Sequence, residues 1–365
     1  MAATPATEFI VQSAQGPYAV TFHEEIAEVT QALRAITGAV LLIDQRVAEL
    51  YANPLASLTE HFPTLTIEAT EEEKTLTGIA RLLTFLQERN ATKQTTLIAI
   101  GGGIIQDIAT FTAHIYYRGI PWVFVPTTLL AQCDSCIGAK AGINFSAFKN
   151  QLGVFHAPAH VFLYPQFITT LSELDTRSGY GEILKLHLIG SIERYETFRE
   201  SVVQHGLLHN PDLRDFIRES LMVKRAIIEH DEYEMNERHL LNYGHTFGHA
   251  LEAITAHEVP HGIAIAWGLD LANALAQALG VLDATLCEDI HRLITQHFAC
   301  PLSRPITPQA LLSAAWRDKK VRDGNLTLIL LRKPGDLVIT RAPSDDALTP
   351  LITRFLTRDH ALHRR

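Results

Sequence analysis

The sequence predicts two domains of different fold class: an α/β domain with a mostly parallel sheet over residues 1–165, and a mainly α-helical domain over residues 166–365. Three observations support this. Strand and helix signals alternate in the first half, the strand signals fade after about Phe167, and Pro158 and Pro165 punctuate the chain between the two halves. A chain of 365 residues is long enough for two domains, each with its own core.

Four short apolar runs in the first half are typical of buried strands, and they cover residues 18–23, 39–44, 95–100 and 121–126. Residues 24–36 and 74–89 have the apolar spacing of amphipathic helices. Strands separated by helices indicate a mostly parallel sheet with helices on both faces. Ligands of such sheets bind at the carboxyl ends of the strands.

Helical periodicity dominates the second half, and the predicted helices cover residues 181–197, 213–229, 240–256, 264–279, 284–297 and 308–316. A hairpin of residues 326–331 and 335–340, with Lys333-Pro334-Gly335 at its turn, precedes a terminal helix.

Composition excludes several classes of protein. With 47% hydrophobic and 19% charged residues, the chain is neither disordered nor fibrous. A net charge of −9 argues against a nucleic-acid-binding surface. There is no signal-peptide pattern and no apolar run of membrane-spanning length, so we expect a cytoplasmic protein. Cys133-x-x-Cys136 resembles a redox or zinc motif, but without a second such pair we interpret it as two reduced, structural thiols.

A glycine loop, Gly101-Gly102-Gly103, lies between a predicted strand and a predicted helix. The N–H groups of such a loop and of the helix N-terminus can bind a diphosphate. Asp44, the acid that could hold a ribose hydroxyl, precedes the loop, whereas the ordinary dinucleotide-binding pattern places it about 20 residues after the loop. The loop alone therefore leaves a dinucleotide site and a plain tight turn both open.

Polar residues gather among small and apolar ones in residues 125–153, namely Thr127, Thr128, Asp134, Lys140, Asn144, Lys149 and Asn150. Buried polar groups need partners, and a phosphate or pyrophosphate would supply them. A solvated loop is the alternative.

The stretch from Asn242 to Gly268 holds a candidate metal site. His245 and His249 are four residues apart in a helical pattern, so both imidazoles leave one helix face and could converge on one cation. His261 follows Pro260, and Glu182 in a separate helical segment is a candidate carboxylate. Imidazoles with a carboxylate form the ligand set of catalytic zinc or a related ion. The alternative is that these are ordinary core or surface histidines.

Together these motifs resemble the 3-dehydroquinate synthase family of sugar phosphate cyclases. The resemblance runs from about Asp44 to Val321 and rests on GGGIIQD, Tyr117-Arg118-Gly119, VPTTLLAQCDS, GAKAGIN with KN, SGYGEILK, NYGHTFGHALE, His261-Gly262 and Asp318-Lys319-Lys320. It implies an N-terminal, Rossmann-like NAD-binding domain, a helical C-terminal domain that carries the metal, and commonly a homodimer.

The resemblance also implies roles for individual residues. The metal ligands would be Glu182, His245 and His261, while His249 would meet the substrate phosphate. NAD would contact Asp44, Glu71, Lys74, Gly102, Gly103, Asp107, Thr127, Thr128, Lys140, Lys149 and Thr170. The substrate would contact Asp134, Lys140, Asn150, Lys185, Lys224, Glu234, Arg238, Asn242 and Lys320, and Arg118 would reach a phosphate across a dimer interface.

The implied reaction converts 3-deoxy-arabino-heptulosonate 7-phosphate to 3-dehydroquinate and phosphate, by transient oxidation, phosphate elimination, re-reduction and intramolecular aldol closure. The required cofactors are catalytic NAD and a divalent metal, zinc or cobalt. Lys140, Glu182, Lys185, Lys224, Glu234, Arg238, Asn242, His249 and Lys320 would be the catalytic residues.

Several positions depart from the family pattern and leave the substrate open. Ala139 and Phe145 are more similar to specialised cyclases that act on sedoheptulose 7-phosphate, whereas His249, Asn242 and Arg238 match the ordinary family pattern. The alternative is therefore a cyclase of secondary metabolism that uses sedoheptulose 7-phosphate, glucose 6-phosphate or an amino analogue. A metal-dependent alcohol dehydrogenase of similar build is a further alternative, and net production of NADH would identify it.

Overall fold

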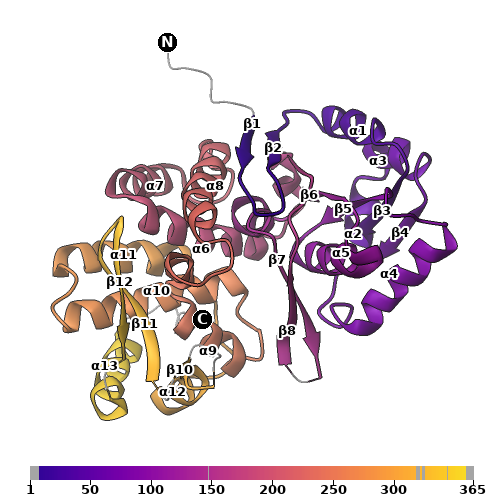
Figure 1. Cartoon of the computed structure of the whole chain (residues 1–365). Coiled ribbons are helices and arrows are strands. Elements are labelled where there is room, and N and C mark those ends of the chain that lie inside the picture. The colour runs from indigo at the N-terminus through magenta and orange to yellow at the C-terminus, as the bar shows by residue number, and fades with distance from the viewer. Residues whose placement is uncertain (1–7, 147, 318–320, 323–324, 343, 359–365) are drawn as a thin grey trace. The chain divides into compact units, whose positions relative to one another are not determined.

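The computed structural model describes residues 8–146, 148–317, 321–322, 325–342 and 344–358. The chain forms two compact units (Figure 1). We call Met1–Leu171 with Ile228–Tyr233 the sheet unit, and Ser172–Ile227 with Glu234–Arg365 the helical unit. The chain thus passes between units after Leu171, while the domain boundary after residue 165 stays a prediction.

The central sheet of the sheet unit has seven strands among the described residues. Their order is β1 (Glu8–Val11), β2 (Tyr18–Phe22), β9 (His160–Leu163), β6 (Trp122–Pro126), β5 (Thr96–Gly101), β3 (Ala39–Asp44) and β4 (Thr64–Ile67). β1 pairs with β2 in antiparallel fashion, and the other neighbouring pairs are parallel. The prediction of a mostly parallel sheet is confirmed.

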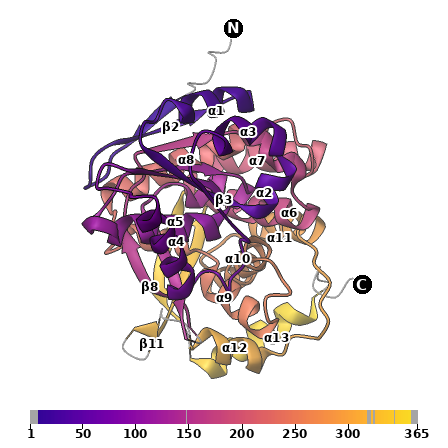
Figure 2. The ribbon, with the colours of Figure 1, turned by 90° about the vertical axis from the view of Figure 1, so that its right-hand side faces the viewer.

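Two groups of helices cover the sheet. On one face, α1 (Ile26–Arg34), α2 (Gln45–Leu50) and α3 (Ala52–Thr59) form an apolar core with alternate side chains of the strands, including Leu41 and Ile43 of β3. The helices α4 (Leu76–Glu88) and α5 (Gly103–Ile115) lie on the opposite side of β3 (Figure 2). Helices on both faces explain why the strands are apolar throughout.

The polar stretch that we expected to be a ligand-binding loop contains more secondary structure than predicted. It forms the π-helix η2 (Ala131–Ser135) and an antiparallel ribbon of β7 (Lys140–Phe145) and β8 (Phe148–Phe155). The ribbon was missed because small and polar residues hide the alternation that marks a strand.

The segment Ile228–Tyr233 joins the sheet unit through the turn between β1 and β2. The Gln12 N–H donates to Glu229 Oε1 at 2.8 Å, and the Ser13 hydroxyl donates to Glu232 Oε1 at 2.5 Å. The rings of Phe155 and Tyr233 also meet edge to face.

The described helices of the second half are α6 (Glu173–Gly190), α7 (Ile192–His205), α8 (Leu213–His230), η4 (Glu237–Asn242), α9 (His245–Ile254), α10 (His261–Ala278), α11 (Ala284–His297), α12 (Pro308–Ala315) and α13 (Asp345–Thr357). The predicted hairpin is confirmed as β11 (Asn325–Lys333) and β12 (Asp336–Arg341), with β10 (Val321–Arg322) beside β11. None of the helices in the described chain is long and apolar enough to cross a bilayer.

Two predicted helices were wrong in their extent. The helix expected over residues 181–197 breaks at Ser191, which is extended and whose hydroxyl accepts the Arg194 N–H to begin α7. The helix expected over residues 240–256 breaks at Gly244, whose φ of +79° is in the left-handed region. Apolar periodicity continues through both breaks, so it could not show them.

Candidate metal centre and cofactor edge

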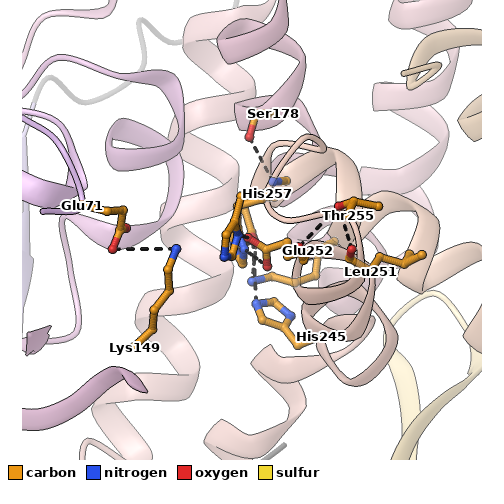
Figure 3. A network of polar contacts seen from close by, with 12 residues as sticks. Glu71, Lys149, Ser178, His245, Leu251, Glu252, Thr255 and His257 are labelled. Carbon is orange, nitrogen blue, oxygen red and sulfur yellow. Dashed lines mark hydrogen bonds and ion pairs between the residues drawn. The ribbon is translucent and has the colours of Figure 1, made fainter. Parts of the chain in front are cut away.

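Two helices of the helical unit approach each other at glycines. A Cβ on Gly181 of α6 would lie 1.9 Å from the carbonyl oxygen of Gly262, and a Cβ on Gly262 of α10 would lie 1.7 Å from the carbonyl oxygen of Ser178. The Gly262 N–H donates to the Ser178 hydroxyl at 3.0 Å (Figure 3). The absence of side chains here lets α6 and α10 touch through their backbones, next to Glu182 and His261.

The helix α9 also packs closely on α10. A Cβ on Gly268 would lie 2.1 Å from the Gly244 carbonyl oxygen, and one on Gly248 would lie 2.6 Å from the Ile265 side chain. Gly244 itself precedes α9, so His245 is the first residue of that helix. The segment from Asn242 to Gly268 is rich in small residues, and this allows three helices to meet at one place.

Glu182 of α6, His245 of α9 and His261 of α10 form one potential metal-binding group, with all three ligand atoms within 4.8 Å of one another. Oε1 of Glu182 lies 3.1 Å from Nε2 of His261 and 3.7 Å from Nε2 of His245. The Glu182 side chain is 2% exposed, whereas that of His261 is 33% exposed. The group is therefore buried on one side and open on the other, as a catalytic metal site requires.

The second ring nitrogen of each histidine is held by the protein. Nδ1 of His245 lies 3.2 Å from the Tyr243 carbonyl oxygen, and Nδ1 of His261 lies 2.9 Å from Oε2 of Glu252. Both contacts favour a proton on Nδ1 and leave the Nε2 lone pair directed at the space beside Glu182. Two imidazole nitrogens and one carboxylate oxygen fit zinc or cobalt.

The charge balance of the group favours a cation. Burial alone would lower the pKa of His261, but its hydrogen bonds to Glu182 and Glu252 raise that pKa to about 10. The imidazole thus carries a proton between two carboxylates when no metal is bound. A divalent cation would take the place of that proton.

His249 lies close to the group but is not part of it. Its ring centroid is 5.2 Å from that of His245 and 5.8 Å from that of His261. A second potential group joins His249 with Glu252 and His261. The structure thus groups His245 with Glu182 and His261, and His249 with Glu252 and His261, so the choice of metal ligands stays a prediction.

Other predicted substrate residues of the helical unit lie on α6, α8 and around η4. Lys185 is buried one turn from Glu182 and forms an ion pair with its Oε2, and Lys224 of α8 is also buried. The Asn242 amide donates to Glu234 Oε1 at 2.7 Å, and Arg238 on the same η4 turn is 3% exposed. Lys320 lies outside the described residues.

The predicted NAD-binding residues of the sheet unit lie where parallel strands end. Asp44 ends β3 and caps α2 by accepting the Arg46 N–H at 2.9 Å. Gly102 connects β5 to α5, Gly103 begins α5, and Thr127 and Thr128 follow β6. β3, β5 and β6 are adjacent, so these residues line one edge of the sheet. Parallel sheets bind nucleotides at this edge.

A polar network joins the next group of predicted residues. Lys74 Nζ lies 2.6 Å from Asp107 Oδ2, and Lys149 Nζ lies 3.8 Å from Glu71 Oε2 (Figure 3). The Asn144 amide donates to Glu71 Oε2 at 2.8 Å, and Asn144 Oδ1 accepts the Asn150 N–H at 3.0 Å. Asn144 thereby links the segment before α4 to the β7–β8 ribbon.

The remaining predicted residues are dispersed over the sheet unit. Asp134 lies on η2, Lys140 begins β7, and Arg118 ends η1 (Tyr116–Arg118) with a φ of +60°. Thr170 ends η3 (Pro165–Thr170), where its hydroxyl lies 3.2 Å from that of Tyr51. The roles of all these residues stay predictions.

Glu252 is the polar residue of the metal centre that the sequence argument missed. It lies three residues after His249 and seven after His245, a spacing that places all three on one helix face. That spacing could have indicated that Glu252 lies near the histidines of α9. It could not show that Glu252 contacts His261, because the position of His261 depends on the tertiary structure.

Comparisons with known proteins agree with these observations. Residues 64–178 match the family model described as 3-dehydroquinate synthase N-terminal, and residues 179–321 match the one described as 3-dehydroquinate synthase C-terminal. The 3-dehydroquinate synthase of Opitutus terrae is 35% identical over 320 residues, which are 86% of this chain and 87% of that protein. The 3-dehydroquinate synthase of Coxiella burnetii is 36% identical over 342 residues, covering 91% and 94%.

Solved structures of related cyclases are also similar. One is 2-deoxy-scyllo-inosose synthase complexed with carbaglucose-6-phosphate, NAD+ and Co2+, with a TM-score of 0.85 over 95% of this chain and 99% of that chain. Its identity of 24% shows the fold alone. ValA, a 2-epi-5-epi-valiolone synthase from Streptomyces hygroscopicus with NAD+ and Zn2+ bound, has a TM-score of 0.82 and is 26% identical, covering 94% of this chain and 97% of that chain.

Proposed function

Because this chain belongs to the 3-dehydroquinate synthase family, we propose that it is a phosphate-eliminating cyclase, a carbon–oxygen lyase that converts 3-deoxy-arabino-heptulosonate 7-phosphate to 3-dehydroquinate and phosphate. The observation that carries the proposal is the group of Glu182, His245 and His261, whose ligand atoms lie within 4.8 Å of one another. The curated relatives named above, at 35% and 36% identity over most of the chain, support this substrate.

The proposed enzyme uses NAD and one divalent metal, zinc or cobalt. NAD supplies a reversible hydride acceptor, and the metal supplies a Lewis acid that lowers the pKa of a substrate hydroxyl. Glu182, His245 and His261 would hold the metal. The NAD site would lie at the strand ends of the sheet unit, with Gly102 and Gly103 against its diphosphate.

The buried lysines and His249 would act on the substrate. Lys185 and Lys224 are buried cations, and each can stabilise negative charge that develops on a substrate oxygen in a site of low dielectric. His249 can donate to the phosphate from α9, beside the metal ligands. Lys140 and Asn150 would bind the same phosphate and fix its position during elimination.

Arg238 would recognise the carboxylate that distinguishes the keto-acid from neutral sugar phosphates. Its guanidinium provides a planar pair of donors that matches a carboxylate. The Asn242–Glu234 hydrogen bond braces the same η4 turn. We further propose that the active form is a homodimer in which Arg118 reaches the partner's substrate, since Arg118 follows Tyr117, which is 55% exposed.

A specialised cyclase is the second candidate, because Ala139 and Phe145 depart from the family pattern. The direct test measures phosphate release by the purified protein with NAD and Zn2+ or Co2+, offered the keto-acid phosphate, sedoheptulose 7-phosphate or glucose 6-phosphate in parallel. Release from the keto-acid alone, without net NADH, is the expected result. Release only from a neutral sugar phosphate would identify the specialised cyclase, and accumulation of NADH would identify a dehydrogenase.

Arg238→Lys provides a sharper version of this test. It should lower kcat/KM for the keto-acid by about 10- to 100-fold, because a lysine cannot form the bidentate contact. Arg218→Lys is the matched control: Arg218 pairs with its neighbour Glu219 at 3.0 Å on α8 and has no proposed role. An unchanged kcat/KM in Arg238→Lys would remove the main argument for a carboxylate-bearing substrate.

A further inference from the structure

Glu252 ends the NYGHTFGHALE motif, but neither the residue roles assigned above nor the proposed mechanism gives it a function. Its Oε2 accepts from Nδ1 of His261 at 2.9 Å, on the side of the ring opposite to Nε2. Nε2 of the same ring lies 3.1 Å from Glu182 Oε1. The His261 ring therefore lies between two carboxylates, of which one belongs to the metal-binding group and the other does not.

The local fold explains how the ring comes to that place. After α9 the chain turns back through Ala256 and His257, which both have left-handed φ values, of +50° and +62°. The Thr255 hydroxyl donates to the Leu251 carbonyl oxygen at 2.8 Å, and the His257 N–H donates to that of Glu252 at 2.9 Å (Figure 3). This tight loop returns His261 to the face of α9 that carries Glu252.

Glu252 is itself held in a defined position. Its side chain is 15% exposed, and His257 Nδ1 lies 3.9 Å from its other oxygen, Oε1. A carboxyl oxygen at 2.9 Å from Nδ1 fixes both the rotation of the imidazole and the tautomer with a proton on Nδ1.

We infer that Glu252 is the positioning residue of the metal centre: it orients His261 so that Nε2 is presented to the cation, without binding the cation itself. The inference rests on the metal site of the proposed function. Carboxylates that accept from a metal-bound histidine commonly change metal affinity by about 10- to 100-fold when they are removed.

The experiment measures the affinity of the metal-free full-length protein for Zn2+ and Co2+ by competition with a chelator, in the absence of substrate. Glu252→Gln removes the charge and keeps the size, and Glu252→Ala removes the hydrogen bond. Both should weaken binding by about 10- to 100-fold and shift the visible absorption of bound Co2+. Glu258→Gln is the matched control in the same loop, because the Glu258 carboxylate accepts from the N–H and the hydroxyl of Ser303, both at 2.8 Å.

Thermal unfolding of the metal-free variants separates positioning from a general structural role. The metal-free Glu252→Gln protein should unfold within a few degrees of the parent, so that the loss is specific to the metal. Unchanged metal affinity in both variants would overturn the inference. A stoichiometry of two metal ions per parent chain and one per Glu252→Ala chain would also overturn the inference. Glu252 would then be a ligand of a second ion, together with His249 and His261.

The outcome is independent of whether the proposed reaction occurs. If the parent releases no phosphate from any substrate but its metal affinity depends on Glu252, the proposed function fails and the positioning role stands. If phosphate is released and the variants bind metal as tightly as the parent, the positioning role fails alone.

Discussion

Oε1 of Glu182 lies 3.1 Å from Nε2 of His261, although Glu182 lies in α6, His261 lies in α10, and the two belong to different sequence motifs. Their approach depends on the contact between Gly181 and Gly262, the neighbours of the two ligands in the chain. The proposed metal centre therefore depends on backbone packing as much as on the identity of its ligands.

Glu182→Gln should weaken Zn2+ or Co2+ binding by at least about 100-fold, because it removes one of three ligands and the charge nearest the cation. Turnover should fall with it. Inductively coupled plasma analysis after dialysis would measure the bound metal. Lys185→Met is the control, since it removes the ion-pair partner of Glu182 and should lower turnover while the metal is retained. Full metal occupancy in Glu182→Gln would refute the assignment.

Gly181→Ala should destabilise the helical unit by roughly 1–3 kcal/mol or more, because the new Cβ would meet a backbone oxygen at 1.9 Å and backbone cannot move aside cheaply. Chemical denaturation would measure the change. Gly190→Ala in the same helix is the matched control: its Cβ would approach only side-chain atoms of Val223 and Arg194, which can shift. Equal losses in both variants would show that the α6–α10 contact is not special.

His187 should make stability fall in mild acid. Burial lowers the pKa of this α6 imidazole to about 4, while its Nδ1–H bonds to the Ile183 carbonyl oxygen at 2.9 Å. The unfolded chain, with a pKa near 6.5, binds the proton more readily than the folded chain. Stability from this residue is therefore complete above pH 6.5 and decreases as the pH falls to about 4, by on the order of 3 kcal/mol.

Urea denaturation at pH 7.5, 6 and 5 would measure this dependence. In His187→Phe, which retains the contacts with the rings of Phe198 and Phe216, the pH dependence between 6.5 and 5 should become shallower. A slope that is the same in both proteins would mean that His187 is not the group responsible.

Removing only one partner of the Lys74–Asp107 ion pair should lower the stability of the protein. Lys74 is 7% exposed and lies 2.6 Å from Asp107, whose other oxygen accepts the Gly142 N–H at 3.0 Å. Lys74→Met would leave the partly buried Asp107 carboxylate without its cation and should destabilise the protein by up to about 3 kcal/mol. Lys74→Met with Asp107→Asn should recover part of that loss. Additive losses in a double-mutant cycle would contradict this coupling.

NAD affinity offers an independent measurement on the same variants. If Lys74 and Asp107 contact the cofactor as proposed, the double variant should bind NAD weakly even where its stability has partly recovered. Isothermal titration with NAD would decide this, and Lys93→Met, on the loop before β5, serves as a surface control. NAD binding as tight as that of the parent would remove both residues from the proposed cofactor site.

Much of the sheet unit could be predicted because its strands and helices have clear local patterns. Residues 39–43 are all apolar and Asp44 follows them, and these six residues form β3 with the predicted bounds. The β7–β8 ribbon could not be predicted, since Gly142, Asn144 and Asn150 carry neither apolar alternation nor a recognisable turn. Their pairing is decided by contacts with Asp107 and Glu71, which are distant in sequence.

The sequence by itself determined the class of the two halves, the family and the identity of the residues that can bind a metal, because these depend on local periodicity and on motif spacing. Only the tertiary structure showed how close the side chains of Glu182, His245 and His261 come to one another and which carboxylate supports His261. Those contacts depend on how α6, α9 and α10 meet at Gly181, Gly248 and Gly262, and a close approach of backbones far apart in the chain leaves no periodic signal in any one segment.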